Sequence, residues 1–454
     1  LTTKQALRQE RLCSKIDRLH LLSIQYCYDW IQDLVPYVQP TSLVFNDYMD
    51  CQPDAPLSIP NRAEIHALLT KHSIKLDPVK ANMPWRSSIT NVRQNMHWQA
   101  VIDGYTRILR AFAQDETAKR TPSPDVITVA DMAMKELKRV ENGSSRFVTY
   151  MYPFASEHRM RLLAEMQCLS LLFDESWEHH EHDHNQTFFL SLMPPINNKD
   201  LHPKTPLQEA VWKSIEAVYE EDERVGGNGG TGLIEFLTNY IKHPTPVKEM
   251  KTFTDFMDYR FNDGGMMYKR VCWNSAKFSI GSNLSLQEPK MARIVRLLSD
   301  QMLESNDIAS FDKEKKHWLS GNAKQFLTTN GTAIIRDIFS LKSDEAAKAL
   351  AYANQMETER QIDRELGDLL STGQLSADEW HLVNAMLYCV TGNLISAVTM
   401  CRYGGEAARI PTTKKRPDAN GLSGGMWPMI LLFSATVALT SQWYLGVFKS
   451  VGFW

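Results

Sequence analysis

The sequence predicts an all-α protein, in which a helical bundle is preceded by a helical extension and followed by an apolar helix. Apolar residues recur every three or four positions over long segments, as they do in amphipathic helices. The strict alternation that is typical of half-buried strands is nearly absent. Segments rich in proline or glycine, at 119–124 and 226–232, lie where helices are expected to end.

The first 90 residues contain two candidate helices, at 6–34 and 62–72, but no motif with an evident function. We therefore expect an N-terminal helical extension over residues 1–90, followed by the bundle over 91–410. The helical segments expected in the bundle are 95–113, 155–173, 206–222, 246–262, 288–305, 344–369 and 376–402. Thr205-Pro206 suits an N-cap and the first turn of one of these helices. A polar linker over 411–425 then leads to an apolar segment over 426–454.

The part of this apolar segment from 426 to 448 carries no charged residue and is longer than the roughly 20 residues that span a bilayer. Trp427 and Trp443 near its ends, with the basic cluster 414–416 before it, are typical of a membrane-inserted helix. Its serine, threonine and glutamine residues instead fit a terminal helix packed on the rest of the chain. Of these two interpretations we favour a tail anchor in an intracellular membrane.

The composition of the chain limits which binding partners and which cellular compartment we expect. A net charge of −3, with 23% charged residues, provides no basic surface, so we expect no nucleic-acid partner. The 7 cysteines are odd in number and lack C-x-x-C spacing, which favours reduced thiols in a reducing compartment. The first five residues contain no apolar run, so no signal peptide is expected. The bulk of the chain is therefore expected in the cytoplasm.

Two polar segments carry the chemistry of the chain. In the first, Asp174 and Glu178 are four residues apart, so they share one face of a helix. In the second, Asn306, Ser310 and Glu314 follow the same spacing. Carboxylate, amide and hydroxyl oxygens suit Mg²⁺, which completes its coordination with water and with substrate phosphates. The sequence therefore predicts two helix faces that hold a diphosphate together with its Mg²⁺ ions.

These segments resemble the aspartate-rich motif and the Asn/Ser/Glu motif of class I terpene synthases, most closely the fungal sesquiterpene cyclases. The first motif departs from the family pattern at Glu175, where an aspartate is usual. The second is matched at all of its defined positions, which are Asn306, Asp307, Ser310, Lys313 and Glu314.

Three further features strengthen the resemblance. The run Tyr152-Pro153-Phe154-Ala155 precedes the aspartate-rich helix, as in many family members. Arg260 lies 46 residues before Asn306, where the family has its diphosphate sensor. The sensor is followed by the linker residue Asp263 and the effector residue Gly264, and the late Arg-Tyr pair of the family corresponds to Arg402 and Tyr403.

The resemblance implies a helical bundle that cyclises a linear prenyl diphosphate and releases diphosphate. It implies three Mg²⁺ ions, for which Mn²⁺ can substitute, held by Asp174 with help from Glu178 and by Asn306, Ser310 and Glu314. The diphosphate would be bound by Arg260, Lys313, Arg402 and Tyr403. Farnesyl diphosphate is the expected substrate, ahead of geranylgeranyl diphosphate, and a sesquiterpene hydrocarbon or alcohol is the expected product. A chain-length prenyltransferase and a non-catalytic isoprenoid-binding protein are the alternatives.

Two other patterns are interpreted structurally. The histidines of 179–184 include a pair with zinc-ligand spacing, but the run follows the acidic motif directly, so we expect a solvated loop. Residues 227–232 fit the dinucleotide motif G-x-G-x-x-G, yet they follow a charged helix rather than a strand. We therefore expect a flexible loop between helices there.

Overall fold

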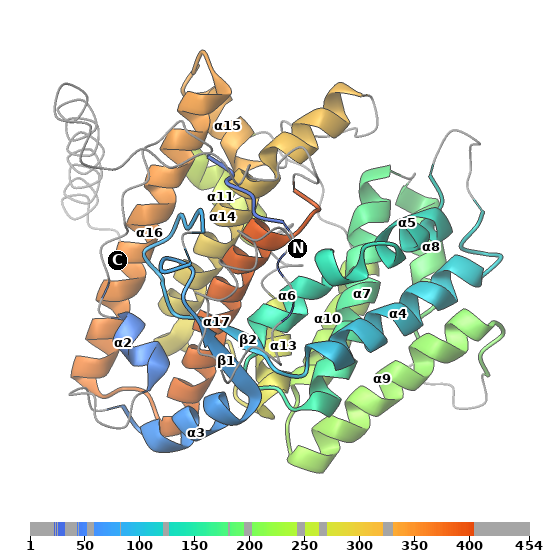
Figure 1. Ribbon diagram of the computed structural model, residues 1–454, viewed down its shortest axis with the longest axis horizontal. Coiled ribbons are helices and arrows are strands. Elements are labelled where there is room, and N and C mark those ends of the chain that lie inside the picture. The colour runs from blue at the N-terminus through green and yellow to red at the C-terminus, as the bar shows by residue number, and fades with distance from the viewer. Residues whose placement is uncertain are drawn as a thin grey trace. The chain divides into compact units, whose positions relative to one another are not determined.

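The computed structural model describes residues 22, 24, 26–31, 43, 45–51, 59–81, 83–120, 127–179, 182–194, 202–242, 250–262, 270–320 and 330–403. All of them belong to one compact unit (Figure 1). The α-helices in chain order are α2 (Phe45–Asp50), α3 (Arg62–His72), α4 (Trp98–Gln114), α5 (Val129–Leu137), α6 (Ser145–Met151), α7 (Glu157–His179), α8 (His182–Ser191), α9 (Pro206–Val225), α10 (Gly229–Lys242), α11 (Phe253–Asn262), α13 (Cys272–Ile280), α14 (Ala292–Leu319), α15 (Gly331–Ile338), α16 (Asp344–Thr372) and α17 (Ala377–Thr399). The short 3₁₀ helices η2 (Val140–Asn142) and η4 (Pro289–Met291) and the strands β1 (Ser73–Leu76) and β2 (Val92–Asn95) complete the described elements.

Helix α17 forms the centre of the bundle. It packs against α6, α13 and α14 and is buried over nearly its whole length. Gly392 allows the contact with α6, because a Cβ atom there would lie 2.5 Å from the Cα atom of Met151. The length and composition of α17 would suffice to cross a membrane, but its burial inside the protein is that of a core helix.

The remaining helices pack on both sides of this centre. On one side α14 packs along α16, and α15 contacts both of them; on the other side α4 packs along α7, and α9 covers both (Figure 1). Helix α14 is held in place by a buried apolar stripe that includes Ile294, Leu298 and Met302. The polar motif in the second half of this helix is therefore carried into the interior by the packing of the first half.

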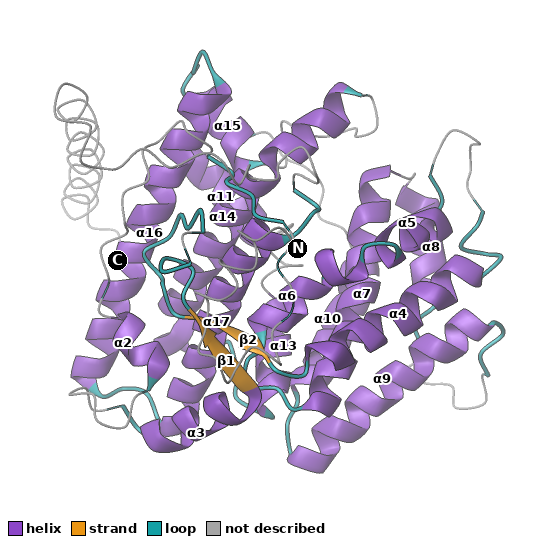
Figure 2. Ribbon diagram, in the orientation of Figure 1, coloured by secondary structure: helices purple, strands orange, loops and turns teal. Residues whose placement is uncertain are grey.

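The sequence-based helices agree well with this architecture. The segment predicted at 62–72 has the same bounds as α3, and those at 206–222 and 344–369 correspond to α9 and α16. The Oγ1 atom of Thr205 accepts a hydrogen bond from the backbone N–H of Gln208 at 3.1 Å, and Pro206 opens α9. The predicted all-α fold class is confirmed, and Figure 2 shows how helices dominate the described chain.

The N-terminal region departs from the prediction in two ways. Residues 26–31 were expected within a helix, but they are not helical, because the N–H of Tyr28 donates instead to the carbonyl of Val398 at 2.6 Å. In addition, β1 and β2 form an antiparallel pair (Figure 2). Polar residues of β2 are buried there, since Asn95 donates to the carbonyls of Tyr152 and Ala155, each at 2.9 Å. Burial of polar side chains removes the alternation by which a strand is recognised.

Residues 229–232 of the glycine-rich segment are helical, in place of the flexible loop that we expected over 227–232. Helix α10 begins at Gly229, where a Cβ atom would lie 2.2 Å from the backbone nitrogen of Phe278 in α13. These glycines therefore permit close contact between two helices. The first turn of α10 is capped by the Asp222 carboxylate, which accepts from the N–H groups of Gly230 and Thr231 at 3.2 Å and 2.7 Å.

The expected histidine loop is also partly helical, since α8 begins at His182. Phe189 of this helix is fully buried and packs against the rings of Phe112 and Phe173. The Ser176 hydroxyl of α7 donates to the Asn185 side chain at 2.8 Å. These contacts order the segment more than its charged composition suggests. Asp263, Gly264, the linker 411–425 and the segment 426–454 lie outside the described residues.

Candidate functional site

The aspartate-rich motif lies near the end of α7. The residues before it, from Leu169 to Phe173, are buried, whereas Asp174 and Glu175 are half-buried. The apolar part of the helix thus holds the two carboxylates at the edge of the core. Glu178 belongs to the same helix, but the structure does not describe its side chain.

Asp174 lies within electrostatic range of four other predicted site residues. Burial raises the pKa of its carboxyl group, and nearby Arg402, Lys313 and Arg260 oppose this effect, whereas Glu314 adds to it. These residues come from α11, α14 and the turn after α17. The fold therefore brings together groups that are up to 228 positions apart in the sequence.

Glu175 connects two of the predicted diphosphate-binding residues. Its Oε1 atom forms an ion pair with Arg402 and lies 3.7 Å from the Nζ atom of Lys313. All three side chains are largely buried. The residue at which the motif departs from the family pattern therefore holds two cations side by side.

Arg260 is held by the second residue of the Asn/Ser/Glu motif. Its Nη2 atom donates to Oδ1 of Asp307 at 2.7 Å, and Oδ2 of Asp307 accepts from the N–H of Gly331 at 2.7 Å. Burial raises the pKa of Asp307 to about 6, against the opposing effect of Arg260. This contact fixes the predicted sensor from α11 against α14.

Two of the three predicted ligands of α14, Ser310 and Glu314, lie beside a residue that the sequence did not indicate. The Nδ2 atom of Asn330, which is fully buried, donates to Oε2 of Glu314 at 2.9 Å and lies 3.4 Å from Oγ of Ser310. It also donates to the backbone carbonyl of Asp307 at 2.8 Å. The Oδ1 atom of the same side chain caps α15. An asparagine before a helical run is a recognisable N-cap, but its reach to α14 has no sequence pattern.

Asn306 contacts the late Arg-Tyr pair. Its Nδ2 atom donates to the hydroxyl of Tyr403 at 3.2 Å, which directs the amide oxygen to the other side. An amide oxygen is a suitable ligand for Mg²⁺, whereas the amide nitrogen is not. The hydrogen bond thus leaves the amide oxygen of Asn306, rather than its nitrogen, directed away from Tyr403.

The residues present fit a magnesium site. Glu314 of α14 lies close enough to Asp174 of α7 to disfavour the ionisation of Asp174, and a divalent cation between the two helices would relieve this repulsion. In the described part of the chain no group of three His, Cys, Asp or Glu residues has the arrangement of a metal site. The predicted set does not require one, because it also uses the oxygens of Asn306 and Ser310.

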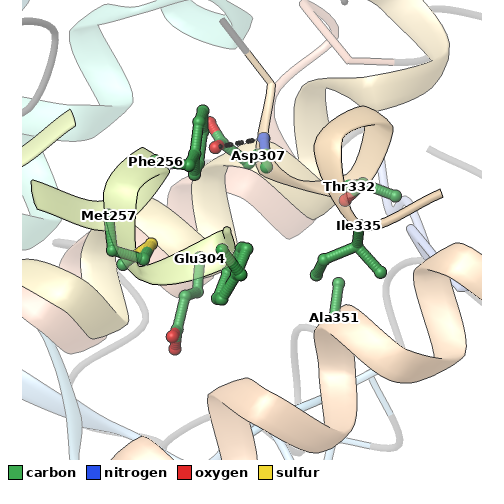
Figure 3. A pocket seen from close by; sticks show the side chains of 9 residues that line it. Phe256, Met257, Glu304, Asp307, Thr332, Ile335 and Ala351 are labelled. Carbon is green, nitrogen blue, oxygen red and sulfur yellow. Dashed lines mark hydrogen bonds between the residues drawn. The ribbon is translucent and has the colours of Figure 1, made fainter. Parts of the chain in front are cut away.

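A small pocket lies beside Asp307, away from α7. Its lining side chains come from α11, α14, α15 and α16, and Figure 3 shows Phe256, Glu304 and Ile335 around it. The dashed line in this view is the hydrogen bond from Gly331 to Asp307. No residue of α7 and neither Arg402 nor Tyr403 lines this pocket. Asp307, which also accepts a hydrogen bond from Arg260, is the residue that connects this pocket to the predicted site.

No protein-family model matches the chain. The chain is 23% identical over 336 residues to terpene cyclase 6 of Gibberella fujikuroi, covering 73% of this chain and 85% of the relative. It is 24% identical over 197 residues to preterpestacin I synthase of Cochliobolus heterostrophus, covering 40% of this chain but only 28% of that protein.

The fold also has a solved counterpart. Aristolochene synthase from Penicillium roqueforti superimposes with a TM-score of 0.51 at 16% identity, covering 66% of this chain and 95% of that structure. At this identity the match establishes the arrangement of helices and nothing about activity.

Proposed function

We propose, from the premise that this chain has the class I terpene synthase fold that its motifs predicted, that it is a terpene cyclase acting on a linear prenyl diphosphate. The observation that carries this proposal is the convergence of oxygen ligands and cations around Asp174. A protein that only bound an isoprenoid, without reacting with it, would need neither the oxygen ligands nor the cations. Farnesyl diphosphate is the substrate that we propose, with a sesquiterpene as product.

Asp174, Asn306, Ser310 and Glu314 would hold Mg²⁺, with Glu178 as a further ligand. When bound, the metal ions supply Lewis-acid stabilisation of the leaving diphosphate. The chain's own contribution is orientation: Tyr403 fixes the amide of Asn306, and Asn330 fixes Glu314. Side chains that are positioned before the substrate arrives need not reorganise during the reaction.

Arg260, Lys313, Arg402 and Tyr403 would bind the diphosphate. Without substrate, Arg402 pairs with Glu175 and Arg260 pairs with Asp307. When the diphosphate binds, each arginine would either leave its carboxylate or contact the carboxylate and the diphosphate together. Once the charge on the diphosphate is neutralised, the allylic C–O bond breaks to give a carbocation and free diphosphate. The buried apolar side chains of the surrounding helices would then exclude water while the cation cyclises.

The test is incubation of the purified chain with Mg²⁺ and either farnesyl or geranylgeranyl diphosphate. We expect a cyclic terpene in the organic extract by gas chromatography with mass spectrometry, together with released diphosphate. Addition of isopentenyl diphosphate distinguishes a prenyltransferase, which would give a longer linear diphosphate. The absence of both diphosphate release and cyclic product with each substrate would refute the proposal.

We also propose that residues 426–448 anchor the catalytic body to an intracellular membrane, leaving that body in the cytoplasm. The support for this is the uncharged length of the segment and the basic cluster before it. An apolar terpene product partitions into lipid, so a membrane location would favour its removal from the enzyme.

A further inference from the structure

A short segment near the N-terminus connects two of the elements that carry the proposed site. Within residues 26–31, the backbone N–H of Tyr28 donates to the carbonyl of Val398, in the last turn of α17, at 2.6 Å. The hydroxyl of the same residue donates to Oδ2 of Asp312, in the second half of α14, at 2.8 Å. Tyr28 therefore holds the end of α17 against α14.

Both ends of this connection lie close in sequence to residues that we have assigned to the diphosphate. Asp312 directly precedes Lys313, and Val398 lies four positions before Arg402. The same two elements also meet within the site, where α14 donates a hydrogen bond to the hydroxyl of Tyr403 at 3.2 Å. The separation of Lys313 and Arg402, which would bind one diphosphate together, therefore depends on how the end of α17 is placed on α14.

The surroundings of Tyr28 fix the direction of its hydrogen bond. The residue is buried, and its burial and the neighbouring Asp312 carboxylate raise the pKa of the phenol. The hydroxyl therefore keeps its proton and donates it to Asp312. Both oxygens of Asp312 also accept from Nζ of Lys348 in α16, each at 2.7 Å. The acceptor is thus held by a third helix while Tyr28 contacts it.

Other contacts hold the segment in place without the Tyr28 hydroxyl. The Asp29 carboxylate accepts from Nε and Nη2 of Arg86 at 3.0 Å and 2.8 Å. The side chains of Trp30 and Ile31 are fully buried. Removal of the hydroxyl alone should therefore leave the segment folded, so Tyr28→Phe tests the contact with α14 rather than the folding of the N-terminal extension.

We propose that Tyr28 is a positioning residue for the diphosphate site, which fixes the turn that carries Arg402 relative to Lys313 of α14. The inference rests on the proposed function and extends it to the N-terminal extension, which carries none of the sequence motifs. Cations that are already placed before the anion arrives lose less freedom when it binds, so the affinity of the site is higher.

The test measures the binding of inorganic diphosphate with Mg²⁺ to the full chain by isothermal titration calorimetry. We expect Tyr28→Phe to weaken binding about fivefold, which is part of the factor that one hydrogen bond to a charged group contributes. The matched control is Tyr388→Phe, because the buried hydroxyl of Tyr388 donates to the carbonyl of Met49 at 3.1 Å and also joins the extension to α17. Tyr388 lies roughly four helical turns before Arg402, so this variant should bind as wild type does.

A second background assigns the effect to this hydrogen bond. Asp312→Ala removes the acceptor, so the addition of Tyr28→Phe to it should weaken diphosphate binding no further. If Tyr28→Phe weakens binding by the same factor with and without the Asp312 carboxylate, the contact with α14 is not the cause and the proposal is wrong.

Hydrogen exchange of the backbone over 398–403, measured by mass spectrometry, separates the two proposals. Exchange there should be faster in Tyr28→Phe than in Tyr388→Phe, whether or not diphosphate binds. If the wild-type chain does not bind diphosphate with Mg²⁺, the proposed function fails, and the exchange rates alone decide whether Tyr28 holds this turn. If the wild-type chain binds it and Tyr28→Phe binds equally well, only the role of Tyr28 is refuted.

Discussion

Asn330 offers a quantitative test of how the predicted metal face is held. Replacing it by alanine removes the N-cap of α15 and the donor that contacts Glu314 and the carbonyl of Asp307. Loss of a cap costs about 1 kcal/mol, and loss of a hydrogen bond to a charged group costs about 2 kcal/mol more. We therefore expect the free energy of unfolding in urea to fall by about 3 kcal/mol.

The matched control is Ser343→Ala, because Ser343 caps α16 and its hydroxyl accepts only from the N–H of Ala346 at 3.2 Å. This variant should lose about 1 kcal/mol and keep its response to Mg²⁺. Asn330→Ala should in addition need about tenfold more Mg²⁺ for half-maximal release of diphosphate, because Glu314 is no longer oriented. Equal losses of stability in both variants, with equal Mg²⁺ dependence, would show that Asn330 acts as a cap alone.

Four further predictions follow from the same contacts. Asp174→Ala should abolish diphosphate release while its circular dichroism stays that of the wild type, and full activity at ordinary Mg²⁺ concentration would contradict its role as a ligand. Arg260→Lys should lower kcat strongly because the bidentate guanidinium is lost, and wild-type kinetics would leave Arg260 a structural role only. Burial lowers the pKa of His381 to about 4, below its value of about 6.5 in the unfolded chain. The unfolded state therefore binds more protons between these values, so stability falls as the pH drops through this interval, by up to about 3 kcal/mol. His381→Phe should unfold in urea with less dependence on pH, and an unchanged pH profile would exclude His381 as the cause. The full chain should sediment with membranes and resist carbonate, whereas a chain that ends at Gly425 should stay in the supernatant and remain active; a full chain found in the supernatant would refute the anchor.

The sequence predicted those features that depend on neighbours along the chain. Helix α3 and the cap at Thr205 follow from periodicity and local hydrogen bonding, and the common face of Asn306, Ser310 and Glu314 follows from helical spacing. The start of α10 could not be predicted in this way, because Gly229 is required by the backbone of α13 rather than by a turn.

In the candidate site, too, the features set by neighbouring residues could be predicted, whereas those set by distant segments could not. Local spacing indicated which residues of α7 and α14 share a face, but the partners of those residues come from distant segments. Asn330 reaches α14 only because α15 packs there, and Arg260 meets Asp307 only because α11 packs against α14. Such contacts leave no periodic pattern, since each depends on the relative position of two helices.

The ion pairs of Glu175 set a threshold for any anion that enters the site. Arg402 and Lys313 already have a negative partner, so an incoming ligand gains only the difference between its own attraction and that of the internal carboxylate. Chloride and other monoanions carry no more charge than Glu175 and would gain little by displacing it. A diphosphate carries several charges and would compete successfully. The Glu175 carboxylate thus competes with incoming anions for Arg402 and Lys313. Abundant small anions would therefore bind weakly, although the site contains several cations.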